Sequence, residues 1–322
     1  MSKINLLLFV EFILIFGVNA CQQESQNWNS LSSTRGYPEL VYDYNSDSLW
    51  IFDETKNTVG YIDNNGNGNN SVIQNIPYPS TLDLQNTILD FCASEDIWVV
   101  TDNGKLLLYD TQDRIWVENL SVNDRVRSCE PLNSKAIAIV AGKNKVGIVN
   151  REDVDWLPDP PGTVKNLYQD DFGNIWVVSY NSSEDKYIIY KQEGKDGWSE
   201  QFRDLGGRLL LVKNNSIWTA GGLVTVFESS IENDIDVSGT PLTQIQIDGL
   251  LLDLFSDKNH NIWLVTNKNV MLRTPGKNDF SVVSLPANVD RIIDSTFDIK
   301  NCLLYISTDI GILYNTNNCK AQ

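Results

Sequence analysis

The chain contains a single histidine, His260, which is the first candidate for acid–base chemistry. It lies in a polar run just before an apolar segment that begins at Ile262. A general base needs a partner within hydrogen-bond reach, and the sequence identifies none. A G-x-S-x-G motif and a phosphate-binding glycine loop are also missing. We therefore interpret His260 as a turn residue and predict no catalytic residue.

Residues Asp63 to Gly68 match the start of a calcium-binding loop, because oxygen-bearing side chains alternate before a glycine. The last ligand of such a loop is a bidentate Glu, and Gln74 stands at that position. No pair of flanking helices is indicated. We interpret the segment as a flexible turn between repeats, and we predict neither a bound metal nor a cofactor.

The four cysteines beyond Cys21 form no C-x-x-C spacing, which argues against a zinc site. Cys302 and Cys319 flank a predicted hairpin that turns near Asp309. Strand pairing would place residue 302 opposite about residue 317, so we predict a disulfide between these cysteines; two free thiols are the alternative. Cys92 and Cys129 fall on the first strands of different repeats, and we predict buried thiols there.

The N-terminus has the pattern of an export signal. Lys3 precedes an apolar run from Ile4 to Val18, which is shorter than the roughly 20 residues of a membrane-spanning helix. Residues 18–21, Val-Asn-Ala-Cys, resemble a bacterial lipoprotein cleavage box, although Asn19 departs from it. We predict a signal peptide at 1–20 and a lipid on Cys21. Soluble secretion and an uncleaved anchor are the alternatives. A polar tether follows at 21–34.

A short apolar strand, usually beginning Ile-Trp, recurs along the rest of the chain. Its anchor residues are separated by 48, 39, 39, 42, 45 and 42 positions. A period of this length with several strands in each copy is typical of β-propeller blades. We expect each anchor to fill the core between neighbouring sheets. The anchors are Trp50, Trp98, Ile137, Trp176, Trp218, Trp263 and Tyr305.

The pattern predicts an all-β, seven-bladed β-propeller over residues 35–322, behind the N-terminal export signal. Val, Ile, Tyr and Trp dominate runs that are separated by turn residues, as in strands. The last repeat has room for only three strands. We predict that residues from about Trp28 to Gly36 pair with Gly311 to Thr316 as its outer strand and so close the ring.

The first strand of each blade should line a central channel. Ten residues before each anchor, five blades carry a polar side chain, and these are our candidate ligand-binding residues. Arg127 and Arg208 would create a local positive spot suited to a carboxylate or phosphate. The alternative is that strand starts are polar because they meet solvent, and a shift by one residue would turn each side chain around. The seven positions are Leu40, Ile88, Arg127, Asn166, Arg208, Asp253 and Ser295.

The composition limits the partners. The chain has 25 Lys and Arg against 42 Asp and Glu, a net charge of −17. Such a protein repels phosphate backbones, so we do not expect nucleic acid as a partner. We expect a monomer outside the cytoplasm, either secreted or in contact with a membrane only through the lipid on Cys21.

Two short motifs resemble known propeller repeats. Residues Asp171 to Val178 are similar to the two-component-regulator propeller repeat, whose core is D-x-x-G-N-[LI]-W, and Asp257 to Trp263 is similar with His260 in place of glycine. Residues 49–53 and 57–63 resemble repeats of the streptogramin B lyase group. The first resemblance implies a sensing module. The second implies a lyase that uses a histidine base beside a metal-binding acidic residue.

Three functions follow from these observations. The first is a non-enzymatic exported propeller that binds a protein or a small ligand, because no catalytic set is present. The second is a lyase or lactonase with a metal in the channel. The third is a detached extracytoplasmic sensor, which would need a separate signalling partner.

If Cys21 carries the lipid, the Cys21→Ser variant should be found in the soluble fraction while the wild-type protein remains with membranes. Fractionation and mass spectrometry of the mature N-terminus measure this. A mature wild-type protein with an unmodified Cys21 would contradict the prediction.

Overall fold

The computed structural model describes the greater part of the chain in thirteen segments. The described residues are 28–32, 38–43, 47–53, 58–63, 74–76, 88–94, 96–132, 136–194, 197–203, 207–213, 216–221, 223–228 and 243–315.

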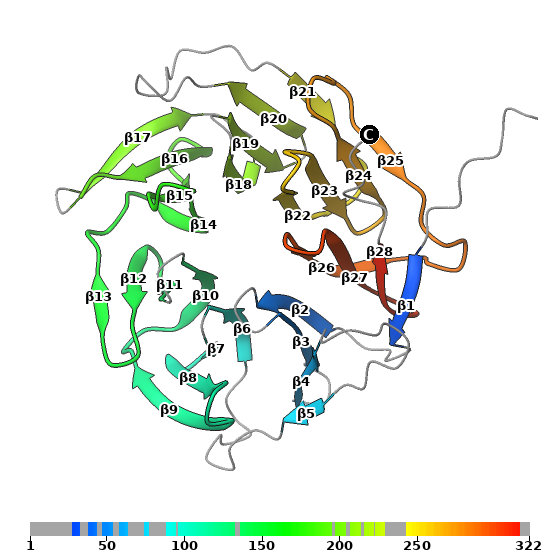
Figure 1. Cartoon of the computed structure of the whole chain (residues 1–322). Helices are drawn as coiled ribbons and strands as arrows, with labels where there is room; N and C mark the ends of the chain where they lie inside the picture. The colour runs from blue at the N-terminus through cyan, green and yellow to red at the C-terminus, as the bar shows by residue number, and fades with distance from the viewer. Residues whose placement is uncertain are drawn as a thin grey trace, which may run out of the picture.

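The described strands form seven antiparallel sheets of four strands each, arranged around a central axis (Figure 1). The all-β propeller class predicted from the repeat is confirmed. Counted from the axis outward, the sheets are β2 (Pro38–Asp43), β3 (Ser48–Asp53), β4 (Thr58–Asp63) and β5 (Gln74–Ile76); β6 (Ile88–Ala93), β7 (Ile97–Thr101), β8 (Lys105–Asp110) and β9 (Ile115–Ser121); β10 (Val126–Pro131), β11 (Ile137–Ala141), β12 (Lys145–Val149) and β13 (Val154–Trp156); β14 (Thr163–Gln169), β15 (Ile175–Asn181), β16 (Lys186–Gln192) and β17 (Trp198–Arg203); β18 (Gly207–Lys213), β19 (Ser216–Gly221), β20 (Leu223–Glu228) and β21 (Thr243–Gln246); β22 (Leu251–Ser256), β23 (Ile262–Thr266), β24 (Val270–Arg273) and β25 (Ser281–Val283); and β26 (Ile292–Asp298), β27 (Leu303–Thr308), β28 (Gly311–Asn315) and β1 (Trp28–Ser32).

The predicted anchors all lie on the second strand of their sheets and are buried. Trp263 is completely inaccessible, and Trp98 and Trp176 are nearly so. They pack in clusters that join the faces of neighbouring sheets; Trp263, for example, contacts Phe297 of the next sheet. The prediction that these side chains form the core is therefore confirmed.

A buried carboxylate holds the anchor of the fourth sheet. Asp170, at the turn between β14 and β15, accepts hydrogen bonds from the backbone N–H groups of Phe172 and Asn174 at 3.0 and 2.8 Å. Its second oxygen accepts from the Asn174 side chain at 2.8 Å and from the indole Nε1 of Trp176 at 2.9 Å. The aspartate of the repeat motif is thus Asp170, and it ties the turn to the core.

The same arrangement recurs at Asp257, which accepts from Asn261 and from the indole of Trp263 at 3.0 Å. Both turns need a residue in the left-handed region of backbone conformation. Gly173 supplies it at φ 84°, and His260 takes the equivalent place at φ 62°. Glycine adopts this region without steric cost, whereas other residues enter it rarely. His260 is therefore an exposed turn residue, as predicted.

Strand β1 closes the ring as the outer strand of the last sheet, as predicted. It pairs antiparallel with β28, with Trp28 opposite Asn315 and Ser30 opposite Leu313. The indole of Trp28 also donates a hydrogen bond to the carbonyl of Ser284 at 2.8 Å. The two ends of the chain are thus tied together, and an exposed sheet edge is covered.

The fold also corrects and limits the N-terminal assignments. Strand β1 lies within residues 21–34, the range predicted as a tether, so the propeller begins before residue 35. The predicted signal peptide, Cys21, Cys319 and residues 64–68 of the calcium-like segment lie outside the described residues. Within the described ranges, no helix has the length and apolar character needed to cross a membrane.

Replacing Asp170 with alanine should lower the free energy of unfolding by about 3–5 kcal/mol, because several enclosed donors, including the Trp176 indole, lose their acceptor. Denaturant unfolding measures this change. The matched control is Asp171→Ala, at the exposed neighbouring carboxylate, which should cost less than about 1 kcal/mol. Equal losses in the two variants would contradict the assigned role of Asp170.

Candidate functional site

A cavity of about 560 Å³ lies where the innermost strands of all seven sheets meet. Two sets of positions on these strands line it, and the strand pairing defines both sets. The outer tier comprises the residues that pair with the position two beyond the anchor on the second strand. In the third sheet the anchor position is Ala138, one residue after the predicted Ile137. Its members are Glu39, Asp90, Ser128, Asn166, Leu209, Asp253 and Asp294.

The inner tier lies two residues further along each innermost strand, and a β-strand rises about 3.3 Å per residue, so the tiers are about 7 Å apart. These residues pair directly with the anchor position, which for Glu130 is Ala138. Except for one glutamate, the inner tier is uncharged, and most of it is apolar or aromatic. Its members are Val41, Cys92, Glu130, Tyr168, Leu211, Phe255 and Thr296.

A register shift marks the start of the outer tier in six of the seven described innermost strands. In β22, for example, the shift falls between Leu251 and Asp253, and in β6 it falls between Ile88 and Asp90. Such bulges bend a strand and redirect a side chain, and they are enriched near functional sites. Here they lie directly before the residues that line the cavity.

The cavity is strongly acidic. The part of the lining that the structure describes includes no Lys, Arg or His side chain. It includes six carboxylates, those of Glu39, Asp90, Glu130, Asp171, Asp253 and Asp294. The negative charges therefore have no opposite charge beside them in the described lining. Low-dielectric walls strengthen the field of such charges and favour a positively charged occupant.

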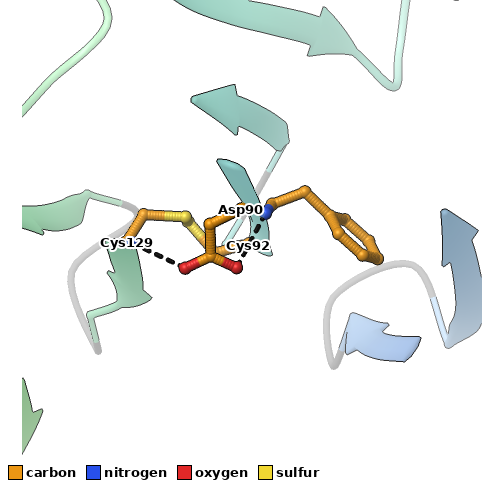
Figure 2. Close-up of a disulfide and its surroundings, with 4 residues drawn as sticks. Asp90, Cys92 and Cys129 are labelled. Atoms are coloured by element: carbon orange, nitrogen blue, oxygen red, sulfur yellow. Dashed lines mark hydrogen bonds between the residues drawn. A yellow bond between two sulfur atoms is a disulfide. The ribbon is translucent and has the colours of Figure 1, made fainter. Parts of the chain in front are cut away.

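Two of these carboxylates have a clear structural role. Asp90 accepts the backbone N–H of Phe91 with one oxygen and that of Cys129, on the neighbouring sheet, with the other, each at 2.9 Å (Figure 2). Asp294, on β26, accepts the backbone N–H of Leu40, on β2, across another sheet boundary at 2.6 Å. These bonds link innermost strands that do not share a sheet.

A disulfide between Cys92 and Cys129 adds a covalent link at the same boundary, with the Cα atoms 6.1 Å apart (Figure 2). The prediction that these residues are free thiols is therefore wrong. They are 37 residues apart, close to one repeat, so they occupy similar places on the innermost strands of adjacent sheets. A separation of about one repeat between two cysteines is therefore the feature of the sequence that could have predicted this disulfide. Cys302 is also disulfide-bonded, and its pairing with Cys319 stays a prediction.

Burial in the cavity shifts the acidity of the carboxyls. It raises the pKa of Asp90 to about 7, although the N–H groups of Cys129 and Phe91 oppose the shift. It raises the pKa of Asp294 to about 6 and that of Asp253 well above its ordinary value. Burial raises the pKa of Glu130 to about 8, and the charges of Asp253 and Asp90 add to this effect. These carboxyls thus act on one another across the cavity.

The structure places three of the five predicted ligand-binding residues in the lining: Asn166, Asp253 and Ser295. Arg127 is not in the described lining. Its guanidinium donates to the carbonyls of Lys143 and Val164 at 2.9 and 2.8 Å, between sheets. The side chain of Arg208 is outside the described part of the chain.

The prediction that Arg127 and Arg208 create a positive spot in the channel is therefore corrected: the described lining of the cavity is acidic. The connection between the first and second strands differs in length from sheet to sheet. It has two residues, 214–215, in one sheet and five residues, 170–174, in another. A fixed spacing from the anchor consequently missed Glu39, Asp90 and Asp294 by one or two positions. A shift of one residue turns a strand side chain to the opposite face.

The site offers no evident base or metal cage. His260 is not among the described residues that line the cavity. Within the described residues, no group of three or more His, Cys, Asp or Glu side chains is placed to hold a metal ion. The arrangement is best suited to binding a positive charge.

Solved structures with this fold have very different sequences. A chain of the mitotic checkpoint complex matches with a TM-score of 0.70 at 10% identity, over 94% of this chain and 98% of that chain. YCF48 bound to D1 peptide matches at 0.65 and 12%, over 92% and 98%. A catalytically inactive virginiamycin B lyase from Staphylococcus aureus with quinupristin matches at 0.66 and 10%, over 89% and 98%.

These likenesses show a β-propeller fold and nothing more specific, because one fold hosts many functions. A streptogramin lyase is among the neighbours, so the resemblance seen in the first repeat is confirmed at the level of the fold. No protein-family model matches the sequence, and no curated protein is a significant match.

The raised pKa values predict how stability depends on pH. A carboxyl whose pKa is higher in the folded state binds more protons when folded, so its contribution to stability is full at low pH and is lost as pH rises. For Glu130 the loss falls between its ordinary pKa of 4.5 and about 8. The melting temperature of Glu130→Gln should therefore fall less between pH 5 and pH 9 than that of the wild type.

The matched control is Glu152→Gln, at an exposed residue outside the cavity, which should keep the wild-type pH profile. Calorimetric melts across this range measure the difference. Parallel profiles for Glu130→Gln and wild type would contradict the assignment.

Proposed function

We propose that this chain is an exported, seven-bladed, non-enzymatic β-propeller that binds a positively charged ligand or protein segment in its central cavity. The observation that carries the proposal is the cavity lined by six carboxylates, with no cationic side chain in the described lining. A charged group leaves water only where opposite charge compensates it. A cation is therefore the ligand whose entry this site favours.

Several features support the other parts of the proposal. The seven four-stranded sheets are each counted as a blade. The charged start, apolar run and small residue before Cys21 support export and a lipid on Cys21. The described disulfide supports an oxidising compartment, since such bonds rarely persist in the cytosol. YCF48, a structural neighbour, has been solved with a peptide, which is a precedent for a protein partner on this fold.

An enzymatic function has less support. The resemblance to streptogramin lyases implies a histidine base in the channel, and the only histidine of this chain lies on an exposed turn. The described lining offers carboxylates and tyrosine hydroxyls for proton transfer, and no histidine. We therefore retain binding as the function.

The mature protein should bind a tetra-arginine peptide at pH 8.5 and should not bind tetra-glutamate. Because the cavity supplies the attraction, the double variant Glu130→Gln/Asp253→Asn should weaken binding at least about tenfold, or about 1.4 kcal/mol. Isothermal titration calorimetry measures both affinities.

The matched control is the double variant Glu152→Gln/Asp155→Asn, which removes the same two charges from exposed positions. It should bind like the wild type. If the two double variants weaken binding equally, the peptide recognises the general negative surface and the proposal is rejected.

A further inference from the structure

Glu130 is the residue of the cavity that the fold explains least. It is the single carboxylate of the inner tier, where the equivalent positions in the other sheets are uncharged. The structure shows no hydrogen-bond donor to its carboxylate among the described residues, and its pKa reflects burial and two other carboxylates. Glu130 is half-buried, and a charge in an enclosed space without an opposite charge or donor is unfavourable. Such a group at a cavity wall is a candidate for binding.

Asp253, in the outer tier, also has a carboxylate oxygen that no described residue of the fold binds. It accepts the backbone N–H of Leu254, on its own strand, at 2.7 Å with one oxygen. By contrast, Asp90 and Asp294 each bind an N–H of a neighbouring sheet as well. The fold therefore uses Asp90 and Asp294 as links between sheets, and it leaves an oxygen of Asp253 available to the cavity.

Glu130 and Asp253 belong to strands β10 and β22, which lie on opposite sides of the central axis (Figure 1). Among the charges that act on Glu130, Asp253 has the largest effect. Two carboxylates that repel each other across a cavity form a strong site for one positive group placed between them. The buried hydroxyl of Ser295, which is 3% exposed and lacks a described hydrogen-bond partner, borders the same cavity.

The surroundings of Glu130 select the kind of cation. Tyr168 and Phe255 occupy its tier and line the cavity, and aromatic faces attract organic cations. The inner tier also contains Val41 and Leu211, so a strongly hydrated inorganic ion would lose water there without gaining ligands. An ammonium group attached to an apolar body meets both requirements.

Building on the proposed function, we propose that Glu130 and Asp253 together bind the ammonium group of an apolar organic amine, whose hydrocarbon part packs against Tyr168 and Phe255. The positive group lies between the two carboxylates, and the apolar part fills the uncharged tier. Asp90 and Asp294 hold the sheets in place around this site.

The test uses the full mature protein and three probes at pH 8.5. 2-Phenylethylamine carries both features, 2-phenylethanol replaces the ammonium group with a hydroxyl, and ethylamine lacks the ring. We expect 2-phenylethylamine to bind at least tenfold more tightly than either of the others. Calorimetry and the change in tryptophan fluorescence measure the affinities.

Variants assign the site. Glu130→Gln and Asp253→Asn should each weaken 2-phenylethylamine binding at least tenfold, and Phe255→Leu should weaken it while leaving ethylamine unchanged. Glu152→Gln, at an exposed position, should bind like the wild type. Thermal melts confirm that each variant is folded, and Phe255→Leu provides an independent test if one of the carboxylate variants does not fold.

The outcomes separate this proposal from the more general one. Equal binding of 2-phenylethylamine and 2-phenylethanol, or full affinity in folded Glu130→Gln, would overturn the amine site. If tetra-arginine binds in the cavity and the amines do not, the amine site is rejected and the proposed function stands. If neither binds, both are rejected.

Discussion

The innermost strand of each sheet has a hydrogen-bonding neighbour on one side only, and its other edge faces the axis and the next sheet. Backbone groups on that free edge need partners when they are buried. Aspartates supply them at two boundaries: Asp90 accepts the N–H of Cys129, and Asp294 accepts the N–H of Leu40. The need to satisfy these edges places carboxylates in the centre of the molecule, and the other features of the site follow from it.

Carboxylates also organise the fold away from the axis. Asp170 and Asp257 each hold a turn and the indole of the following anchor, so a local motif sets the position of a side chain in the core between sheets. The turn aspartates are saturated with donors, whereas Glu130 in the cavity has none described. The same type of group is therefore structural in the turns and available for binding at the axis.

The acidic cavity lowers the stability of the fold when its carboxyls are ionised. Placing several carboxyls in one enclosed space raises their pKa values, which means that their ionised forms are unfavourable there. Natural proteins keep such features mainly at functional sites. The links around the cavity, including the Cys92–Cys129 disulfide and the closing strand β1, hold the ring together against this repulsion.

The sequence by itself determined the repeat, the strands, the buried anchors and the closure of the last sheet by β1. These features depend on local patterns: alternation along strands, turn residues between them, and a missing strand in the final repeat. The turn role of His260 was also evident, because its place in the motif corresponds to that of Gly173.

Only the tertiary structure decided which side chains meet at the axis. It also decided that Cys92 and Cys129 form a disulfide. The register of an innermost strand depends on the length of its connection to the second strand and, in six of the seven described sheets, on a bulge before the cavity. A shift of one residue exchanges Arg127 for Ser128, so the polarity of the channel could not be derived from spacing alone. Contacts between adjacent sheets join residues a whole repeat apart, and no local pattern in the chain encodes them.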